Sequence, residues 1–191
     1  MATVQEELIS LFTAIDQAFV EVQSQFPEAV KCGRGCDDCC RAVFDVSLVE
    51  AVALASVMGS LAEDVRELAL IRAAEAAAAW DKLDTGDSTD DLAKGRIRCP
   101  LLGEDGLCIC YDARPVNCRT YGIPTVIGGA GHACGFSGFE SGIDYPTVNL
   151  QQLQDILLDL SVRLAGQKEG GRRWPVAKVL LAPDEIFAVL K

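Results

Sequence analysis

Four cysteines lie within nine residues of one another in the stretch CGRGCDDCC, residues 32–40. A second group occupies residues 99–118, and the last cysteine follows in GGAGHACGF. The nine cysteines are Cys32, Cys36, Cys39, Cys40, Cys99, Cys108, Cys110, Cys118 and Cys134. Clustered thiols of this kind form disulfides, react as nucleophiles, or hold zinc or iron–sulfur clusters. The rest of the sequence helps to choose between these chemistries.

A disulfide framework explains the cysteines poorly. With 191 residues, 50% of them hydrophobic, the chain can form a core without covalent staples. Its N-terminal residues carry neither a basic leader nor a continuous apolar segment, and no apolar run is long enough to cross a bilayer. We therefore expect a cytoplasmic protein without a membrane partner. Disulfides are rare in that compartment, and an odd cysteine count leaves one thiol unpaired, so metal ligation is favoured.

The charge distribution narrows the choice of partner. The net charge of −11 would repel a phosphate backbone, so a nucleic acid is not expected as a partner. Much of the positive charge lies near cysteines in the sequence, at Lys31, Arg34, Arg41, Lys94, Arg96, Arg98, Arg114 and Arg119. Such cations would stabilise an anionic thiolate site, although ordinary surface charges explain them equally well.

Helices are expected to position these cysteines. Hydrophobic periodicity and helix propensity predict helices over about 4–26, 48–58, 61–83 and 149–165, with a short last helix near residue 183. Ser47 and Glu50 form a capping box at the start of the second helix, and Gly166 is the expected stop of the fourth.

Two segments lack helical periodicity. Residues 84–95 are polar and acidic, which predicts a loop, and their aspartates do not have the spacing of a calcium-binding loop. Residues 96–145 contain prolines, many glycines and five cysteines, which predicts irregular structure held by another constraint. We therefore predict one mainly α-helical domain over residues 1–191 with an irregular cysteine-rich metal-binding segment. Its expected parts are helical regions at about 4–26, 48–83 and 149–190, around a metal-binding core formed by 31–41 and 96–136.

The first cysteine group is expected to present converging sulfurs. Gly33 and Gly35 favour a turn leading into a helix, and the sulfurs converge in a turn or a helix alike. Adjacent side chains diverge, so Cys39 and Cys40 do not easily bind one tetrahedral ion together. One of the two would then serve a second metal, another iron or a different role. In the second group, the Cys99-Pro dipeptide is similar to the one that ends some ferredoxin cluster motifs.

CGRGCDDCCR, together with RCPLLGEDGLCICYDARPVNCRTYG, resembles the cysteine-cluster family named after its CxxCxxCC motif. That family is described as a zinc- or iron-chelating domain, and flagellin lysine-N-methylases are related to it. The resemblance covers roughly residues 32–122. It implies that Arg114 and Pro115 shape the loop, and that the metal ligands are Cys32, Cys36, Cys39, Cys40, Cys99, Cys108 and Cys118. Cys110 departs from the family's pattern, in which that position is usually aliphatic.

Several further residues are candidates for the site. Cys134 lies beyond the resembling segment and is expected to be an eighth ligand. His132, the only histidine, is either a ligand or a hydrogen-bonding loop residue. Tyr111, Arg114 and Arg119 are candidates for contacts to a bound cofactor, and hydrogen bonds that orient thiolates would explain Arg119 equally well.

The sequence therefore predicts a metal-binding protein that holds zinc or a four-iron [4Fe–4S] cluster, and the spacing does not decide between them. The metal would staple the fold, or would be delivered to or sensed from a protein partner. The relation to flagellin methylases leans towards the cluster and implies an alternative, an iron–sulfur-dependent methyltransferase-like enzyme with a protein substrate. A third hypothesis, a redox sensor built on Cys39 and Cys40, requires that the metal leave these thiols free.

Overall fold

The computed structural model describes residues 2–84 and 95–190. The loop expected over residues 84–95 therefore lies almost wholly outside the described residues. As predicted, the fold is mainly α-helical. Its elements, in chain order, are α1 (Val4–Gln25), β1 (Asp45–Ser47), α2 (Leu48–Ser60), α3 (Glu63–Asp84), the 3-10 helix η1 (Tyr111–Ala113), α5 (Val116–Thr120), β2 (Thr125–Ile127), β3 (Ala130–His132), β4 (Val148–Asn149), α6 (Leu150–Gly170), β5 (Arg173–Pro175), α7 (Val176–Leu181) and α8 (Pro183–Ala188).

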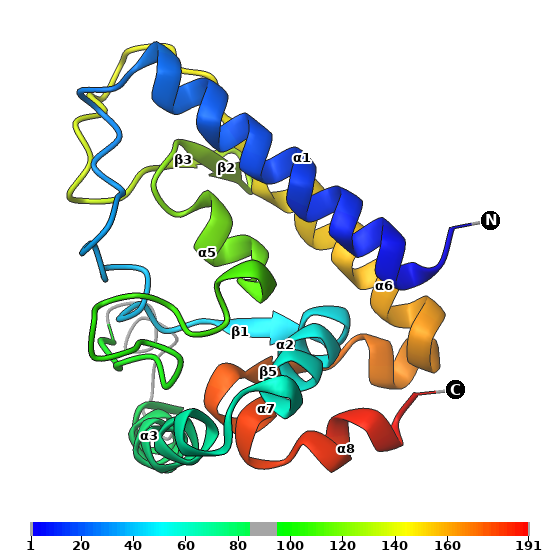
Figure 1. The fold of residues 1–191 in the computed structure, drawn as a ribbon. Helices are drawn as coiled ribbons and strands as arrows, with labels where there is room; N and C mark the ends of the chain where they lie inside the picture. The colour runs from blue at the N-terminus through cyan, green and yellow to red at the C-terminus, as the bar shows by residue number, and fades with distance from the viewer. Residues whose placement is uncertain (1, 85–94, 191) are drawn as a thin grey trace.

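Two of the long helices, α1 and α6, lie side by side and run in opposite directions (Figure 1). Thr3 and Glu6 form a capping box that begins α1, and Arg163 of α6 donates two hydrogen bonds to Glu7 of α1, at 2.7 and 2.6 Å. Their apolar faces share one core cluster with α2 and α5. Its buried members are Leu8, Phe12, Ile15, Val49, Ala53, Val116, Leu157 and Leu160.

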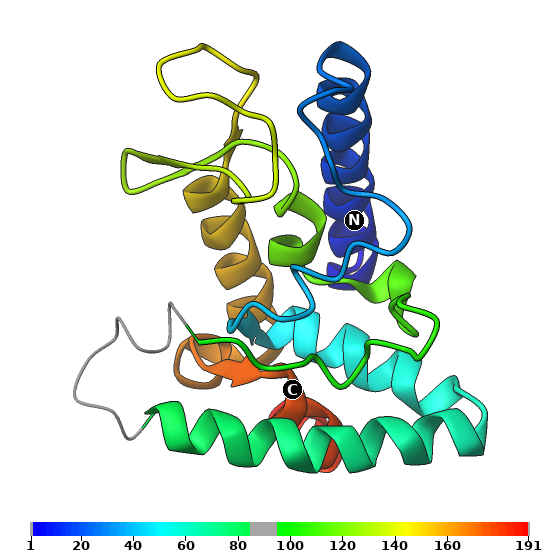
Figure 2. The same cartoon turned by 90° about the vertical axis from the view of Figure 1, so that its left-hand side faces the viewer.

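The second layer consists of α2, α3, α7 and α8, and α3 lies across the base of the upright α1 and α6 in Figure 2. The antiparallel pair β1–β5, in which Val46 faces Trp174, connects this layer to the end of α6. Small side chains on α3, including Ala69 and Ala73, are fully buried against this core. Within the described residues, no helix is long and apolar enough to cross a membrane.

The expected helices are present, and the structure adds elements that periodicity did not predict. α6 breaks at Gly166, where φ is +79°, and continues for one further turn to Gly170. Residues 96–145 are less irregular than expected, because they contain α5 and the hairpin β2–β3, whose turn uses Gly128 and Gly129 at positive φ. These elements have five residues or fewer, too short to show a period in the sequence.

Candidate metal centre

The CGRGCDDCC segment forms two consecutive turns. Cys36 N–H donates to Gly33 O at 3.0 Å, with Gly35 at a φ of +90°, and Cys40 N–H donates to Asp37 O at 2.9 Å. The expected continuation into a helix is wrong. The main chain of the doublet pairs instead with the second cysteine segment.

This pairing places the cysteine doublet beside Cys99. Cys99 N–H donates to Cys40 O at 2.7 Å, and Ile97 N–H donates to Arg41 O at 3.1 Å. An antiparallel bridge between Ala42 and Arg96 extends the contact. Since these main-chain groups are used between segments, they are not available for the hydrogen bonds of a helix.

A tight hairpin brings Cys108 back towards Cys99. Leu102 and Cys108 form an antiparallel bridge, Gly103 N–H donates to Leu107 O at 2.7 Å, and Ile109 N–H donates to Leu101 O at 2.9 Å. The hairpin is fixed from outside as well, because Arg98 donates to Leu102 O at 2.9 Å. Residues 96–145 were expected to be held by a constraint other than a helix, and the hydrogen bonds of this hairpin supply part of it.

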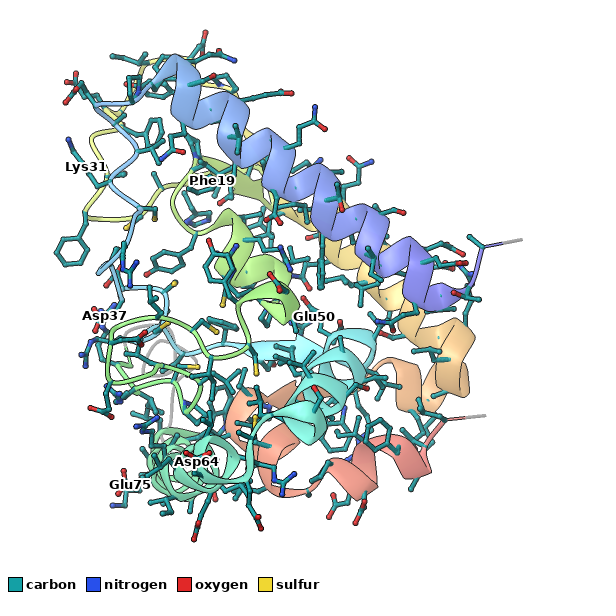
Figure 3. The ribbon with its side chains drawn as sticks, viewed as in Figure 1. Phe19, Lys31, Asp37, Glu50, Asp64 and Glu75 are labelled. Atoms are coloured by element: carbon teal, nitrogen blue, oxygen red, sulfur yellow. The ribbon has the colours of Figure 1, made fainter. Side chains whose placement is uncertain are left out.

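A buried carboxylate positions the short helix α5, which carries Cys118. Glu50 is 2% exposed and accepts hydrogen bonds from Val116 N–H at 2.8 Å, Ser47 N–H at 2.9 Å and Ser47 Oγ–H at 2.7 Å. Figure 3 shows Glu50 between α2 and α5. The capping box was predicted from the sequence. The further bond to Val116, which ties α5 to the start of α2, has no sequence signal because it joins residues far apart in the chain.

One set of thiols surrounds Cys39, and we call it the Cys39 cluster: Cys39, Cys40, Cys99, Cys108 and Cys118. Hydrogen bonds from the thiols of Cys118 and Cys40 lower the pKa of Cys39, and the nearby Arg114 guanidinium lowers it further. The same hydrogen bonds, together with burial, raise the pKa of Cys40 and of Cys118. Burial raises the pKa of Cys99 to about 12.

A second set, which we call the Cys32 cluster, consists of Cys32, Cys36, Cys134 and Asp38. Cys134 Sγ lies 3.6 Å from Asp38 Oδ2 and donates to it. Burial raises the pKa of Cys32 to about 12, and the nearby thiols of Cys36, Cys134 and, from the adjoining Cys39 cluster, Cys39 add to this shift. A thiol hydrogen bond joins Cys32 to Cys36.

Asp38 is the centre of a polar network in the Cys32 cluster. It is 7% exposed and also accepts hydrogen bonds from Tyr121 Oη, at 2.9 Å, and from the Arg96 guanidinium. Burial raises its pKa, but the hydrogen bonds from Arg96 and Tyr121 outweigh burial, so the pKa is lowered overall. No sequence signal singles out Asp38, because an aspartate next to a cysteine looks the same whether it is buried or exposed.

Two contacts bring the loop that carries Cys134 to the end of α1. Gly138 N–H donates to Ala29 O at 2.8 Å. Three rings also pack edge to face, with centroids 5.1 Å apart for Phe26 and Tyr145 and 4.8 Å apart for Phe139 and Tyr145. In Figure 3 sulfur atoms gather between α5 and the segment that bears the labelled Lys31 and Asp37.

Side chains of types that can bind a metal are close to one another in both clusters. Within the described residues, no three Cys, His, Asp or Glu side chains are already arranged to hold one ion. The thiols share hydrogen bonds instead, so to hold an ion their side chains would have to rotate and release their protons to solvent. The donor set, eight thiols and one carboxylate over the two clusters, fits zinc or an iron–sulfur cluster.

Residues 31–135 match a family model named CxxCxxCC, with the description "Putative zinc- or iron-chelating domain". The match covers more than half of the chain. The chain belongs to the CxxCxxCC family. A search of curated proteins found no match, and a search of solved structures found none either. The CxxCxxCC match extends beyond the segment that carried the resemblance and includes Cys134 and His132.

The remaining candidates within the CxxCxxCC match lie in different settings. Cys110 is 2% exposed and packs in the hydrophobic core behind the hairpin. Burial raises its pKa to about 12. His132 is exposed on β3, where it pairs with Thr125.

The three residues expected at a cofactor, Tyr111, Arg114 and Arg119, lie on or beside the turn that precedes α5. Arg114 stacks on the exposed Tyr111 ring, 3.6 Å from its centroid. Arg119 is 4% exposed and donates to Arg114 O at 2.8 Å, to Asp112 O, and to Asp16 of α1 at 2.5 Å. These bonds fasten the turn before α5 to α1, which favours the interpretation of Arg119 as a residue that positions the thiol segment.

Proposed function

We propose that this protein chelates zinc or an iron–sulfur cluster through its cysteine thiolates. The observation that supports this most is the Cys39 cluster, in which five thiols from the doublet, the hairpin and α5 come together. A helical domain with a core of this size has no need of five neighbouring thiols for packing. Soft thiolate ligands select zinc and iron–sulfur clusters over magnesium or calcium.

The electrostatic surroundings support the same proposal. Arg114 lowers the pKa of Cys39 and acts against the burial that raises the pKa of Cys108. A metal held by four thiolates carries net negative charge, and a neighbouring guanidinium offsets part of it. The bound metal would supply cross-links between segments that otherwise meet through few hydrogen bonds.

The space beside the thiols favours chelation over an enzyme that uses a methyl donor. An apolar hollow of about 40 Å³ adjoins Cys39 and Cys99 and is lined also by Phe44 and Trp80. Pockets for drug-sized ligands have volumes of about 300–1,000 Å³. A larger hollow of about 530 Å³ is lined by residues such as Arg172 and Trp174 and by no cysteine. The proposal is therefore confined to chelation.

Anaerobic purification followed by elemental analysis tests the proposal. Stoichiometric zinc in a colourless protein identifies a zinc site, whereas iron with acid-labile sulfide and broad visible absorption identifies a cluster. We expect Cys39→Ala and Cys118→Ala to lose this metal. Cys110→Ala, which removes a neighbouring thiol outside both clusters, is the matched control and should keep it. Metal-free protein in which all nine thiols react under native conditions would refute chelation and favour a redox sensor.

A further inference from the structure

We propose that the thiols form two separate metal sites, and that the Cys32 cluster is a zinc site with Asp38 as its oxygen ligand. This inference rests on the proposed function, chelation by thiolates. It divides the CGRGCDDCC motif, because Cys32 and Cys36 then belong to one site and the Cys39–Cys40 doublet to the other.

The backbone supports this division. The first turn, closed by the hydrogen bond from Cys36 N–H to Gly33 O at 3.0 Å, keeps Cys36 near Cys32. The second turn, closed from Cys40 N–H to Asp37 O at 2.9 Å, directs the doublet into the pairing with Cys99. The first turn therefore positions residues of the Cys32 cluster, and the second turn positions residues of the Cys39 cluster.

The end of α5 contacts the two clusters through different residues. Cys118 hydrogen-bonds to Cys39. Tyr121 donates to Asp38 at 2.9 Å, and Gly122 packs directly on Cys32, leaving no room for a side chain. α5 ends at Thr120, so Cys118 lies on the helix, whereas Tyr121 and Gly122 lie on the turn that follows it.

The number of donors exceeds the four that one tetrahedral ion takes. The Cys39 cluster holds five thiols, and because the side chains of Cys39 and Cys40 diverge, it supplies four of them to one ion; the Cys32 cluster holds three thiols and one carboxylate. A tetrahedral zinc ion takes four ligands, and cysteine sulfur together with aspartate oxygen is an accepted zinc donor set. The Cys32 cluster therefore offers one complete set without the doublet.

The surroundings of Asp38 resemble those of a metal-ligating carboxylate. Arg96 and Tyr121 donate to it from two different segments, and such hydrogen bonds fix a ligand's orientation. Its remaining contact is the 3.6 Å hydrogen bond from Cys134 Sγ. Zinc binding would release the thiol protons of Cys32, Cys36 and Cys134 to solvent, and Asp38 Oδ2, which would keep its hydrogen bond from Tyr121, would then face the ion through its other lone pair. Arg96 then offsets part of the site's negative charge.

Zinc stoichiometry tests the two-site arrangement. The metal-free protein is loaded anaerobically with zinc, and bound metal is counted by native mass spectrometry and elemental analysis. We expect two zinc ions in the wild type, one in Cys134→Ser, one in Cys118→Ser, none in the double variant, and two in the control Cys110→Ala. Circular dichroism before loading confirms that each variant is folded.

Asp38→Asn gives a second readout that does not remove a thiol. It keeps the size of the side chain and one carbonyl oxygen but loses the charge. We expect at least a tenfold weaker affinity for one of the two zinc ions, with the other unchanged. One zinc in the wild type that is lost from both Cys134→Ser and Cys118→Ser would overturn the two-site proposal while chelation stands. No zinc in the wild type would overturn chelation itself.

Discussion

The substitution Gly122→Ala tests the arrangement of the Cys32 cluster without touching any ligand. Gly122 follows α5 and lies against Cys32. A methyl group at this position would lie 2.9 Å from Cys32 Cβ and closer still to its sulfur, with Phe19 Cε2 at 3.2 Å on the other side. Ordinary carbon–carbon contacts are about 3.5–4.0 Å, so Cys32 Cβ must move by roughly 0.6–1.1 Å, and its sulfur must move further.

The size of the effect follows from this displacement. Overpacking of a well-packed site costs about 1–3 kcal/mol. If Cys32 moves aside in the metal-free protein and must return to bind zinc, the cost falls on metal affinity and weakens one zinc Kd by roughly 5- to 150-fold. If Cys32 cannot move aside, the overpacking instead lowers the free energy of unfolding of the metal-free protein by the same amount.

The assay measures both quantities. Zinc affinity is determined by competition with a chelator of known affinity, and stability by urea unfolding of the metal-free protein. Gly33→Ala is the matched control, since it adds the same methyl group next to the same cysteine where no atom lies within 4 Å. If Gly122→Ala leaves both zinc affinities and the unfolding midpoint equal to those of the control, the placement of Cys32 against α5 is wrong.

Three further predictions concern the residues around the thiols. Glu50→Gln replaces a buried carboxylate that accepts three hydrogen bonds, so the free energy of unfolding should fall by about 1.5–3 kcal/mol. An unchanged urea midpoint would contradict this structural role of Glu50. Arg119→Met should lower stability by about 2 kcal/mol or more without changing the number of bound metal ions, whereas loss of metal with stability intact would show direct contact with the cofactor. Because the pKa values of Cys32 and Cys99 are raised to about 12, these thiols are protonated at neutral pH, and metal binding should release protons and weaken as the pH falls. Calorimetry in buffers of different ionisation enthalpy measures this release, and identical heats in all buffers would refute it.

The sequence predicted those features that depend on local pattern. The apolar period of α1 and the capping box before α2 are properties of short windows, and both helices begin where expected. The cysteine spacing and the resemblance it carried identified the family, because a joint pattern of several cysteines rarely recurs by chance.

The division of the thiols could not be predicted in the same way. It depends on the pairing of Cys40 with Cys99, on the contact of Gly122 with Cys32, and on the burial of Asp38 under Tyr121. Each of these joins residues more than 50 positions apart, which no local window contains. β5 was missed for a different reason, since a three-residue element is too short to establish a period. α7 lies within the predicted helical region 149–190, but its six residues are too few to be recognised as a separate helix.

X-ray absorption at the metal edge tests the central claim, thiolate chelation, most directly. The anaerobically purified protein is measured at the zinc and iron edges, and the neighbours of the metal are identified from the scattering. Thiolate ligation predicts a first shell dominated by sulfur, at about 2.3 Å for zinc. That shell should diminish in Cys118→Ser and persist in Cys110→Ala. A first shell made only of oxygen and nitrogen, unchanged by either substitution, would contradict the account.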